Sequence, residues 1–416
     1  MKLLDELFRS EEVERWLSER TCLQAMLSFE SALAKAESHA GVIPESAVQP
    51  ISQQCKAPLF DLNTLAHAAK SSGNVAIPLV KALTAQVAKY DADAARYVHW
   101  GATSQDIIDT GLILQIRGAL TCVAGDLDIF AKGLAELASK HRSTVMIGRT
   151  WMQQALPTTF GAKVAGWLDA IDRHRARLAE TRRRCVVLQF GGAVGTLAAL
   201  NEKADAVAKS LAEELKLPLA EIPWHSNRDR VAEIATTLGL LVGTLGKIAK
   251  DISLLSQTEV AEVFEPSEPG RGGSSTMPHK RNPVACAAVL SAAIRVPGLV
   301  GTMLGAMPQE HERGLGGWHA EWETLPEIVS LAAGAVHTMA EIAARLEVDA
   351  ERMGQNLEAT RGLIFAEAVT MALAHEMGKH AAHELVEAAC SRARKESGHL
   401  RDVLRENDDV QKYLPA

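Results

Sequence analysis

Apolar residues recur at steps of three and four positions along several long stretches of the chain, which is the spacing of a helix with one buried face. Two stretches, residues 109–141 and 228–263, carry this pattern and contain no proline that would interrupt a helix. The apolar positions that define them are Leu112, Ile116, Leu120, Val123, Leu127, Phe130, Leu134 and Leu137 in the first, and Val231, Ile234, Leu238, Leu241, Leu245, Ile248, Ile252 and Leu255 in the second.

The same spacing predicts helices over residues 158–184 and 283–304, with Pro283 in the first turn, and another helix that begins near Thr324 and Pro326. Helices of this length exceed the usual size in globular proteins and favour a bundle of extended rods. No stretch alternates for long between apolar and polar residues as a strand would. The fold class predicted is therefore all-α, with a central bundle of long helices.

The remaining parts of the chain carry shorter and more polar helical patterns. We expect three domains: an N-terminal helical domain over residues 1–108, the long-helix bundle over 109–348, and a C-terminal helical domain over 349–416.

Composition narrows the classes of partner. The 416 residues carry a net charge of −7, which argues against a nucleic-acid surface. We expect no membrane partner, because we identify no apolar run that approaches a membrane span, and the charged residues 1–20 do not resemble a secretory signal. The six cysteines are scattered without a metal-binding spacing, so we expect free thiols, a cytoplasmic location and no metal.

The segment 265–283 holds the densest candidate chemistry. Its glycines and prolines oppose helix formation, and Ser274 and Ser275 precede Lys280 and Asn282 just before the predicted helix. A loop that ends at a helix N-terminus gathers N–H donors and positive potential, which suits a carboxylate ligand. The alternative is a surface linker with an ordinary helix cap, and the density of polar and charged residues makes that reading weaker.

Residues 273–283 resemble the signature loop of the fumarase/aspartase superfamily, which also contains argininosuccinate lyase and adenylosuccinate lyase. The resemblance implies that Ser274 is the catalytic base and that Lys280 and Asn282 bind substrate carboxylate, so the three are assigned as catalytic. It also implies an all-α, three-domain fold.

Three further segments resemble family motifs. Residues 99–110 match the segment whose hydroxyl groups hold a substrate carboxylate, although Asp106 reads first as a cap of the following helix. Residues 148–161 match a second substrate-contact segment, and residues 71–74 a weaker one. The substrate-binding residues that these resemblances imply are Asn74, Thr103, Ser104, Thr150 and Gln153.

Two departures from the family pattern indicate the branch. Amine- and hydroxide-releasing lyases have a histidine where this chain has Trp151, and an orienting glutamate where it has Ala287. An indole cannot act as a general acid or base near neutral pH, so Trp151 is counted as a substrate contact only. These two residues suit an intramolecular reaction better than the release of an amine, because in an intramolecular reaction the substrate's own ionised carboxylate can be the nucleophile.

Residues 99–106, 189–196 and 309–322 are similar to those of bacterial 3-carboxy-cis,cis-muconate cycloisomerases. Arg313 in the last run is a substrate candidate, because its planar fork matches a carboxylate. For the other large side chains of this run, packing at an oligomer core and a place in the site remain equal alternatives: His311, Trp318, His319 and Trp322.

The resemblance implies cycloisomerisation of a small tricarboxylate, without a metal or an organic cofactor, in a homotetramer whose sites are shared between subunits. Two alternatives remain: an adenylosuccinate lyase-type enzyme that releases an amine, and a non-catalytic, crystallin-like use of the same fold.

Overall fold

The computed structural model describes residues 4–266, 272, 273, 277 and 280–413. Helices dominate, so the predicted all-α class is confirmed. The chain divides into two compact units, of which the first comprises residues 1–130, 171–249 and 287–340 and the second comprises the rest. The three-domain division remains a prediction.

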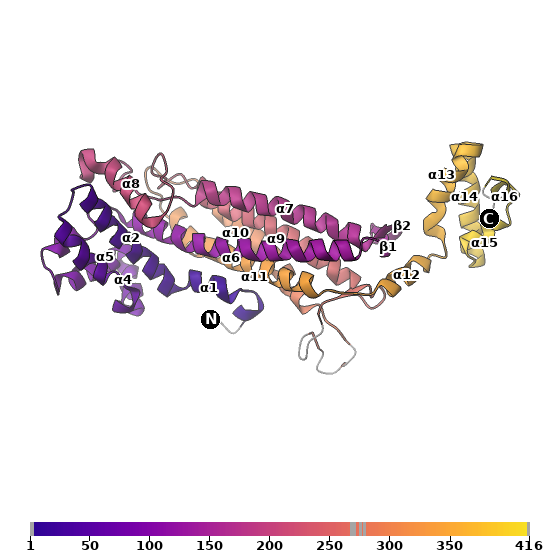
Figure 1. The fold of residues 1–416 in the computed structure, drawn as a ribbon, viewed down its shortest axis with the longest axis horizontal. Helices are drawn as coiled ribbons and strands as arrows, with labels where there is room; N and C mark the ends of the chain where they lie inside the picture. The colour runs from indigo at the N-terminus through magenta and orange to yellow at the C-terminus, as the bar shows by residue number, and fades with distance from the viewer. Residues whose placement is uncertain (1–3, 267–271, 274–276, 278–279, 414–416) are drawn as a thin grey trace. The chain divides into compact units, whose positions relative to one another are not determined.

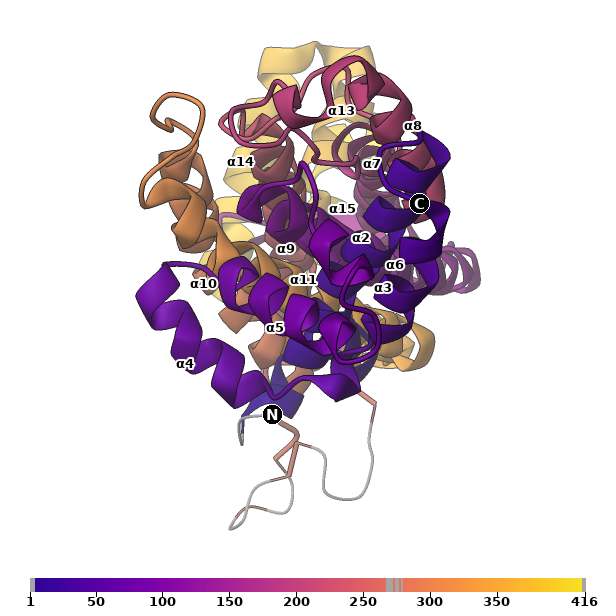
Figure 2. The same cartoon turned by 90° about the vertical axis from the view of Figure 1, so that its left-hand side faces the viewer.

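The first unit holds the N-terminal helices and the larger parts of five long ones. Figures 1 and 2 show α6, α9 and α11 running side by side within it. Its helices are α1 (Glu11–Leu17), α2 (Glu19–His39), α3 (Val48–Gln54), α4 (Leu62–Ser72), α5 (Ala76–Ala88), α6 (Ser104–Lys140), α7 (Phe160–Cys185), α8 (Ala204–Leu215), α9 (Asp229–Leu255), α10 (Val284–Ala306) and α11 (Gly317–Arg345), with 3-10 turns at Asp5–Leu7, Glu45–Ala47, Ala57–Leu59, Ala94–Tyr97 and Ala198–Lys203.

The second unit holds the remaining turns of the long helices, two short antiparallel sheets and the C-terminal helices. Strands β1 and β2 form one sheet, and β3 pairs with β4 in the other. Its elements are β1 (Val145–Thr150), β2 (Gln153–Thr159), β3 (Val263–Phe264), β4 (Glu347–Val348), α12 (Ala350–Glu358), α13 (Ala366–Met377), α14 (Lys379–Glu396), α15 (Leu400–Arg405) and α16 (Asp408–Tyr413), with a 3-10 turn at Leu363–Phe365.

The apolar positions predicted for the two longest patterns are all buried, those of α6 between Leu112 and Leu137 and those of α9 between Val231 and Leu255. The boundary predicted for α11 is wrong, because this helix begins at Gly317 rather than near Thr324. Pro326 lies inside the helix, and Glu321 and Trp318 are already on its buried face about one and two turns earlier. The prediction took Pro326 for a residue of the first turn, whereas it is an interior residue of α11, and the predicted boundary is therefore too late.

The expectation that no apolar run approaches a membrane span is also wrong. By length and composition α6, α9, α10 and α11 are each apolar enough to cross a membrane. In α6, α9 and α11 between 61% and 72% of the apolar window is buried against the rest of the protein, whereas in α10 only 22% is. Three of these helices thus use their apolar residues within the chain, and α10 leaves most of its own exposed or only partly buried.

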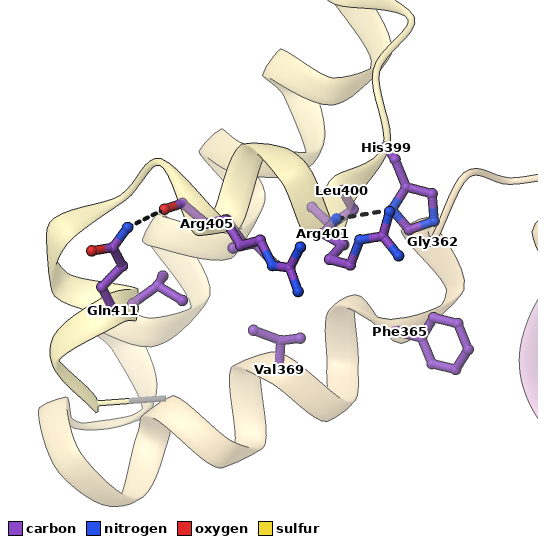
Figure 3. Close-up of a pocket in the computed structure, with 10 residues that line it drawn as sticks. Gly362, Phe365, Val369, His399, Leu400, Arg401, Arg405 and Gln411 are labelled. Carbon is purple, nitrogen blue, oxygen red and sulfur yellow. Dashed lines mark hydrogen bonds between the residues drawn. The ribbon is translucent and has the colours of Figure 1, made fainter. Parts of the chain in front are cut away.

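The C-terminal helices enclose a small core of their own. Leu373 of α13, Val386 of α14 and Leu400 and Leu404 of α15 are buried together with Val410 of α16. Figure 3 shows the side of α13 that carries Val369 facing α15.

Helix α2 carries two buried carboxyl groups seven residues apart, which is one face of a helix. Glu30 Oε1 lies 2.5 Å from His99 Nδ1. Glu37 is fully buried, and neither of its carboxyl oxygens has a hydrogen-bond partner among the described residues. Burial, with a smaller contribution from the charge of Glu30, raises the pKa of Glu37 to about 9, so this carboxyl group is protonated and neutral at neutral pH.

Glu37→Gln should remove a pH dependence of stability. With an ordinary pKa of 4.5 in the unfolded chain and about 9 in the folded one, the folded state binds the extra proton between these values, so the free energy of unfolding falls as the pH rises. The limit is about 1.4 kcal/mol per pH unit. Urea unfolding at acidic and alkaline pH should show a smaller slope for Glu37→Gln than for wild type. Equal slopes would contradict the assignment, and the exposed Glu213→Gln is the control.

Candidate active site

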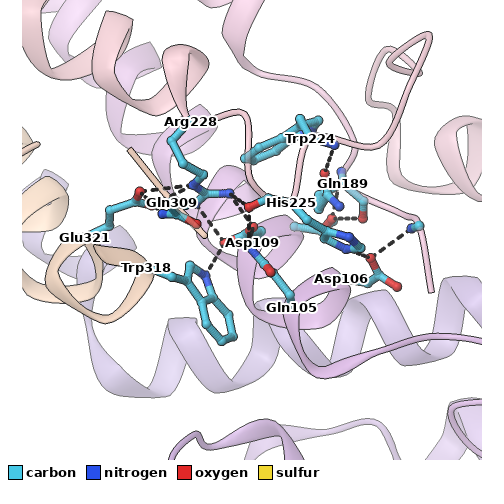
Figure 4. Close-up of polar contacts among 12 residues, drawn as sticks. Gln105, Asp106, Asp109, Gln189, Trp224, His225, Arg228, Gln309, Trp318 and Glu321 are labelled. Atoms are coloured by element: carbon cyan, nitrogen blue, oxygen red, sulfur yellow. Dashed lines mark hydrogen bonds and ion pairs between the residues drawn. The ribbon is translucent and has the colours of Figure 1, made fainter. Parts of the chain in front are cut away.

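The N-terminus of α6 is held by one buried carboxylate, that of Asp106. Its Oδ2 accepts hydrogen bonds from the backbone N–H of Thr103 at 3.0 Å and of Gly192 at 2.9 Å. Its Oδ1 accepts from the backbone N–H of Gly191 at 2.9 Å and lies 2.7 Å from His225 Nε2 (Figure 4). The predicted capping role of Asp106 is therefore confirmed, and the same carboxylate also anchors the segment around Gly191.

One turn further along α6, Asp109 shares the guanidinium of Arg228 with Glu321 of α11. Arg228 Nη1 donates to Asp109 Oδ2 at 2.7 Å, and its Nη2 and Nε donate to Glu321 at 2.5 and 3.0 Å. All three side chains are buried. Burial lowers the pKa of Arg228, but the two carboxylates outweigh this effect and raise it above its ordinary value, so the guanidinium remains charged.

The remaining polar atoms of this cluster are mostly satisfied by neutral donors. Trp318 Nε1 donates to Asp109 at 2.9 Å, Gln105 Nε2 donates to it at 3.1 Å, and Gln309 Nε2 donates to Glu321 at 3.3 Å. Arg228 also lies over the ring of Trp224, 5.0 Å from its centre. Figure 4 shows these side chains converging between α6, α11 and the segment before α9. The cluster therefore fixes the direction in which the first turn of α6 presents Thr103.

Among the predicted substrate contacts of the first unit, Thr103 and Arg313 are brought together. Arg313 Nη2 donates to Thr103 Oγ1 at 2.9 Å and to the carbonyl of Ala193 at 3.0 Å. Arg313 Nε is buried and has no partner among the described residues, so the guanidinium retains donor capacity. Ser104 is the first residue of α6 and is partly exposed.

Asn74 has a structural task in addition to any contact with substrate. Its Oδ1 accepts from the backbone N–H groups of Ala76 and Ile77, at 3.1 and 3.2 Å, and so caps α5. The neighbouring carbonyl of Gly73 lies 3.1 Å from Nε2 of His319, one of the histidines whose role the sequence left open. These contacts connect the end of α4 with the first turn of α11.

In the second unit, Thr150 and Gln153 face each other as the last pair of the β1–β2 hairpin. Trp151 and Met152 form the two-residue turn between them, with positive φ values of 50° and 63° and exposed fractions of 97% and 73%. Positive φ at both central residues defines a type I′ turn, which favours asparagine and glycine. A strained turn that displays a fully exposed indole is typical of a functional position.

An ion pair within the second unit anchors this hairpin close to its turn, at Arg149, which lies opposite Gln154. Arg149 donates to both oxygens of the buried Glu262, at 2.7 and 2.9 Å, and Asn356 Nδ2 donates to Glu262 at 2.8 Å. The strand that leads into the exposed turn is therefore fixed two residues before Trp151.

The signature loop is described only in part, and Ser274 lies outside the described residues. Lys280 is exposed, and Asn282 Nδ2 donates to the carbonyl of Gly272 at 3.0 Å. Gly272 has a φ of 67°, and a Cβ there would lie 2.6 Å from the carbonyl oxygen of Asn282, so this contact requires glycine.

The helix that follows the loop begins at Val284, and its N-terminus is already occupied. The Glu265 carboxylate accepts from the backbone N–H of Ala285 at 3.1 Å and of Cys286 at 2.7 Å. The expectation that this helix end is open to a ligand carboxylate is therefore wrong for these two donors, because a carboxylate from the start of the same loop fills them. Arg281, in turn, pairs with Glu347 at 2.8 Å.

Sequence reasoning missed the Asp109–Arg228–Glu321 cluster, although a signal was present. Asp109 lies three residues before Leu112 and thus on the apolar face of α6, where a carboxylate needs a buried partner. The sequence pattern assigned Arg228 only as the first residue of a predicted helix. No pattern in the sequence indicates that Glu321, more than 90 residues later, completes the set.

The fold and the site together define an enzyme of the helical-bundle lyase class, with hydroxyl, amide and guanidinium groups suited to carboxylates. The chain belongs to the fumarase/aspartase superfamily: residues 9–298 match the family described as "Lyase", and residues 362–416 match the one described as "Adenylosuccinate lyase C-terminus".

Similar proteins match over almost the full length. The chain is 56% identical to the 3-carboxy-cis,cis-muconate cycloisomerase of Pseudomonas aeruginosa, over 99% of this chain and 90% of the relative. It is 54% identical to the protein of the same name from Pseudomonas putida, over 100% of this chain and 98% of the relative. The crystal structure of the 3-carboxy-cis,cis-muconate lactonizing enzyme from Pseudomonas putida superposes with a TM-score of 0.96 at 53% identity, over 100% of this chain and 92% of that one.

Asp106→Asn should destabilise the protein and reduce its activity. Asparagine keeps the shape, but its amide nitrogen cannot accept a hydrogen bond, so N–H groups of the Thr103 and Gly191–Gly192 backbone lose their acceptor. One or two buried donors left unpaired cost about 2–5 kcal/mol. Urea unfolding should show this loss, whereas Asp205→Asn on the exposed side of α8 should behave as wild type. A wild-type unfolding midpoint for Asp106→Asn would contradict the anchoring role.

Proposed function

We propose that this chain catalyses the cycloisomerisation of 3-carboxy-cis,cis-muconate to 4-carboxymuconolactone. The observation that carries the proposal is the match, at 56% identity over 99% of the chain, to a cycloisomerase of this name. The solved lactonizing enzyme, with a TM-score of 0.96, supports it from the fold. The reaction belongs to the degradation of aromatic compounds, and we place it in the cytoplasm, in keeping with the six free cysteines.

The tip of the β1–β2 hairpin favours an intramolecular reaction over release of an amine. Trp151 occupies the position where amine-releasing relatives carry a histidine, and Ala287 replaces the glutamate that would orient it. Indole offers one N–H donor and no ionisable group near neutral pH, so this tip cannot protonate a leaving nitrogen. It can cover the substrate and keep water from the intermediate.

In the proposed mechanism, one carboxylate of the substrate adds across a carbon–carbon double bond and closes the lactone ring. Negative charge then collects beside a second carboxylate. Lys280, Asn282, Thr103 and Ser104 would stabilise this charge as fixed donors. Ser274 would deliver a proton to carbon in this direction and remove it in the reverse one.

Arg313 supports the proposal through its hydrogen bonds. It already orients the hydroxyl group of Thr103, and its Nε has no partner among the described residues. Guanidinium forks bind carboxylates in a bidentate manner, so Arg313 would take a carboxylate of the tricarboxylate substrate. Thr150 and Gln153 would contribute contacts from the hairpin, and Asn74 from the start of α5.

We further propose a homotetramer in which each site takes segments from several subunits. Helix α10 supports this assembly, because 78% of its apolar window is not buried within the chain. Ile294 is 79% exposed and Leu304 46% exposed on this helix. An apolar surface of this kind marks a contact with another protein surface, and a second copy of the chain supplies the same surface.

An adenylosuccinate lyase-type reaction is the second candidate, favoured by the match of residues 362–416 to the adenylosuccinate lyase C-terminus. That match covers the last helices only, whereas Trp151 and Ala287 concern the acid that the reaction requires. Ultraviolet absorbance separates the two candidates. The enzyme should consume 3-carboxy-cis,cis-muconate, seen as a fall in absorbance, and should leave adenylosuccinate unchanged; cleavage of adenylosuccinate would overturn the proposal.

Ser274→Ala should lower kcat about a hundredfold or more, the usual contribution of a positioned acid or base. KM should change little, because Lys280 and Asn282 still bind carboxylate. Initial rates of muconate loss over a range of substrate concentrations measure both constants. Ser275→Ala is the matched control and should retain most of its turnover. If Ser275→Ala were inactive and Ser274→Ala active, the adjacent serine would be the catalytic one.

Ile294→Asp should dissociate the assembly, because it places a charge on the exposed apolar surface of α10. Sedimentation velocity should show a smaller species, and the activity should fall if sites are shared between subunits. Ile222→Asp is the control, since Ile222 is 73% exposed but lies in a loop before α9. An active wild-type monomer at assay concentration would exclude the shared-site assembly.

A further inference from the structure

The C-terminal helices of the second unit form an open cavity that the proposed reaction does not use. It has a volume of about 620 Å³ and lies between α13, α15 and α16 (Figure 3). Its apolar lining includes Phe365 and Val369 on one side and Leu404 and Val410 on the other. This volume lies within the range of cavities that bind small molecules.

The charged lining of the cavity is basic. Arg401 and Arg405 lie four residues apart on α15 and therefore on one face of the helix. Figure 3 shows the guanidinium of Arg405 reaching from α15 toward Val369, above the apolar lining. His399 lies beside Arg401 at the other end, where its Nδ1 accepts from the backbone N–H of Arg401 at 3.0 Å.

The neighbouring carboxylates do not neutralise Arg405. Asp402 pairs with Arg401 at 3.1 Å, and Glu406 pairs with Arg392 at 2.6 Å. The side chain of Arg405 has no hydrogen bond or ion pair within the described part of the chain. A guanidinium with five donors and no acceptor thus stands at the edge of an apolar cavity.

We propose that this cavity binds a small aromatic monocarboxylate. The carboxylate would take the fork of Arg405, with Arg401 adding positive potential, and the ring would cover Val369, Leu404 and the exposed edge of Phe365. A single anionic group fits better than several, because the lining opposite Arg405 is apolar and a second charge there would lose its hydration. The site is therefore distinct in chemistry from one that holds a tricarboxylate.

The test is a titration of the full-length protein with 4-fluorobenzoate, followed by fluorine NMR. Broadening and a shift of the ligand signal should saturate in wild type. Arg405→Gln should weaken binding roughly tenfold or more, as expected for a lost charged hydrogen bond. Arg394→Gln, which removes an exposed arginine of α14 that does not line the cavity, is the matched control and should bind as wild type. A thermal melt of each variant verifies that it is folded.

Two further arms separate this cavity from the carboxylate site of the proposed reaction. Lys280→Ala should leave 4-fluorobenzoate binding unchanged, and 4-fluorobenzylamine, which has the same ring and the opposite charge, should not bind. The proposal is overturned if wild type shows no saturable binding, if Arg405→Gln binds as tightly as wild type, if Lys280→Ala abolishes binding, or if the amine binds equally well.

Discussion

The buried guanidinium of Arg228, shared by Asp109 and Glu321, is the constraint on which the first unit depends. It joins α6, the start of α9 and α11, three segments that are more than 90 residues apart in sequence. An apolar core would hold the same helices together, but it would tolerate small rotations and slides. A buried charge that is paired through directional hydrogen bonds does not tolerate such movements, because a rotation that leaves one charged group unpaired costs about 3–5 kcal/mol. The phase of α6, and with it the position of Thr103, is set by this requirement.

Much of the fold follows from periodicity. The apolar positions of α6 and α9 are buried as their spacing predicted, because a helical face that repeats over many turns can hardly be read in another way. Local signals were less secure. The helix start predicted near Thr324 and Pro326 lies seven to nine residues too late, since proline marks either a first turn or an interior position and the sequence does not distinguish them. The short hairpin was missed as a hairpin because its turn contains Trp151 and Met152 instead of asparagine and glycine.

The sequence predicted which residues could belong to the candidate site, but it did not predict which of them are joined by hydrogen bonds and ion pairs. Motif resemblance indicated Thr103 and Arg313 separately, and the structure joins them by a hydrogen bond. Conversely, the N-terminus of α10 looked open to a ligand until Glu265, from the far end of the same loop, was found to occupy it. Pairings of this kind depend on which distant segments the fold brings together, and this cannot be inferred from single positions in a sequence.

The left-handed turn at Trp151 and Met152 also bears on how this protein can be engineered. Asparagine and glycine adopt positive φ with little cost, whereas each of these larger residues gives up about 1 kcal/mol or more to do so. A search for heat-resistant variants would therefore select Asn-Gly at this turn, and with it an enzyme that has lost its exposed indole. If Trp151 contacts the substrate as we propose, thermostability and activity compete at this one pair of residues, and a screen on melting temperature alone would discard the residue that distinguishes this chain from the amine-releasing lyases.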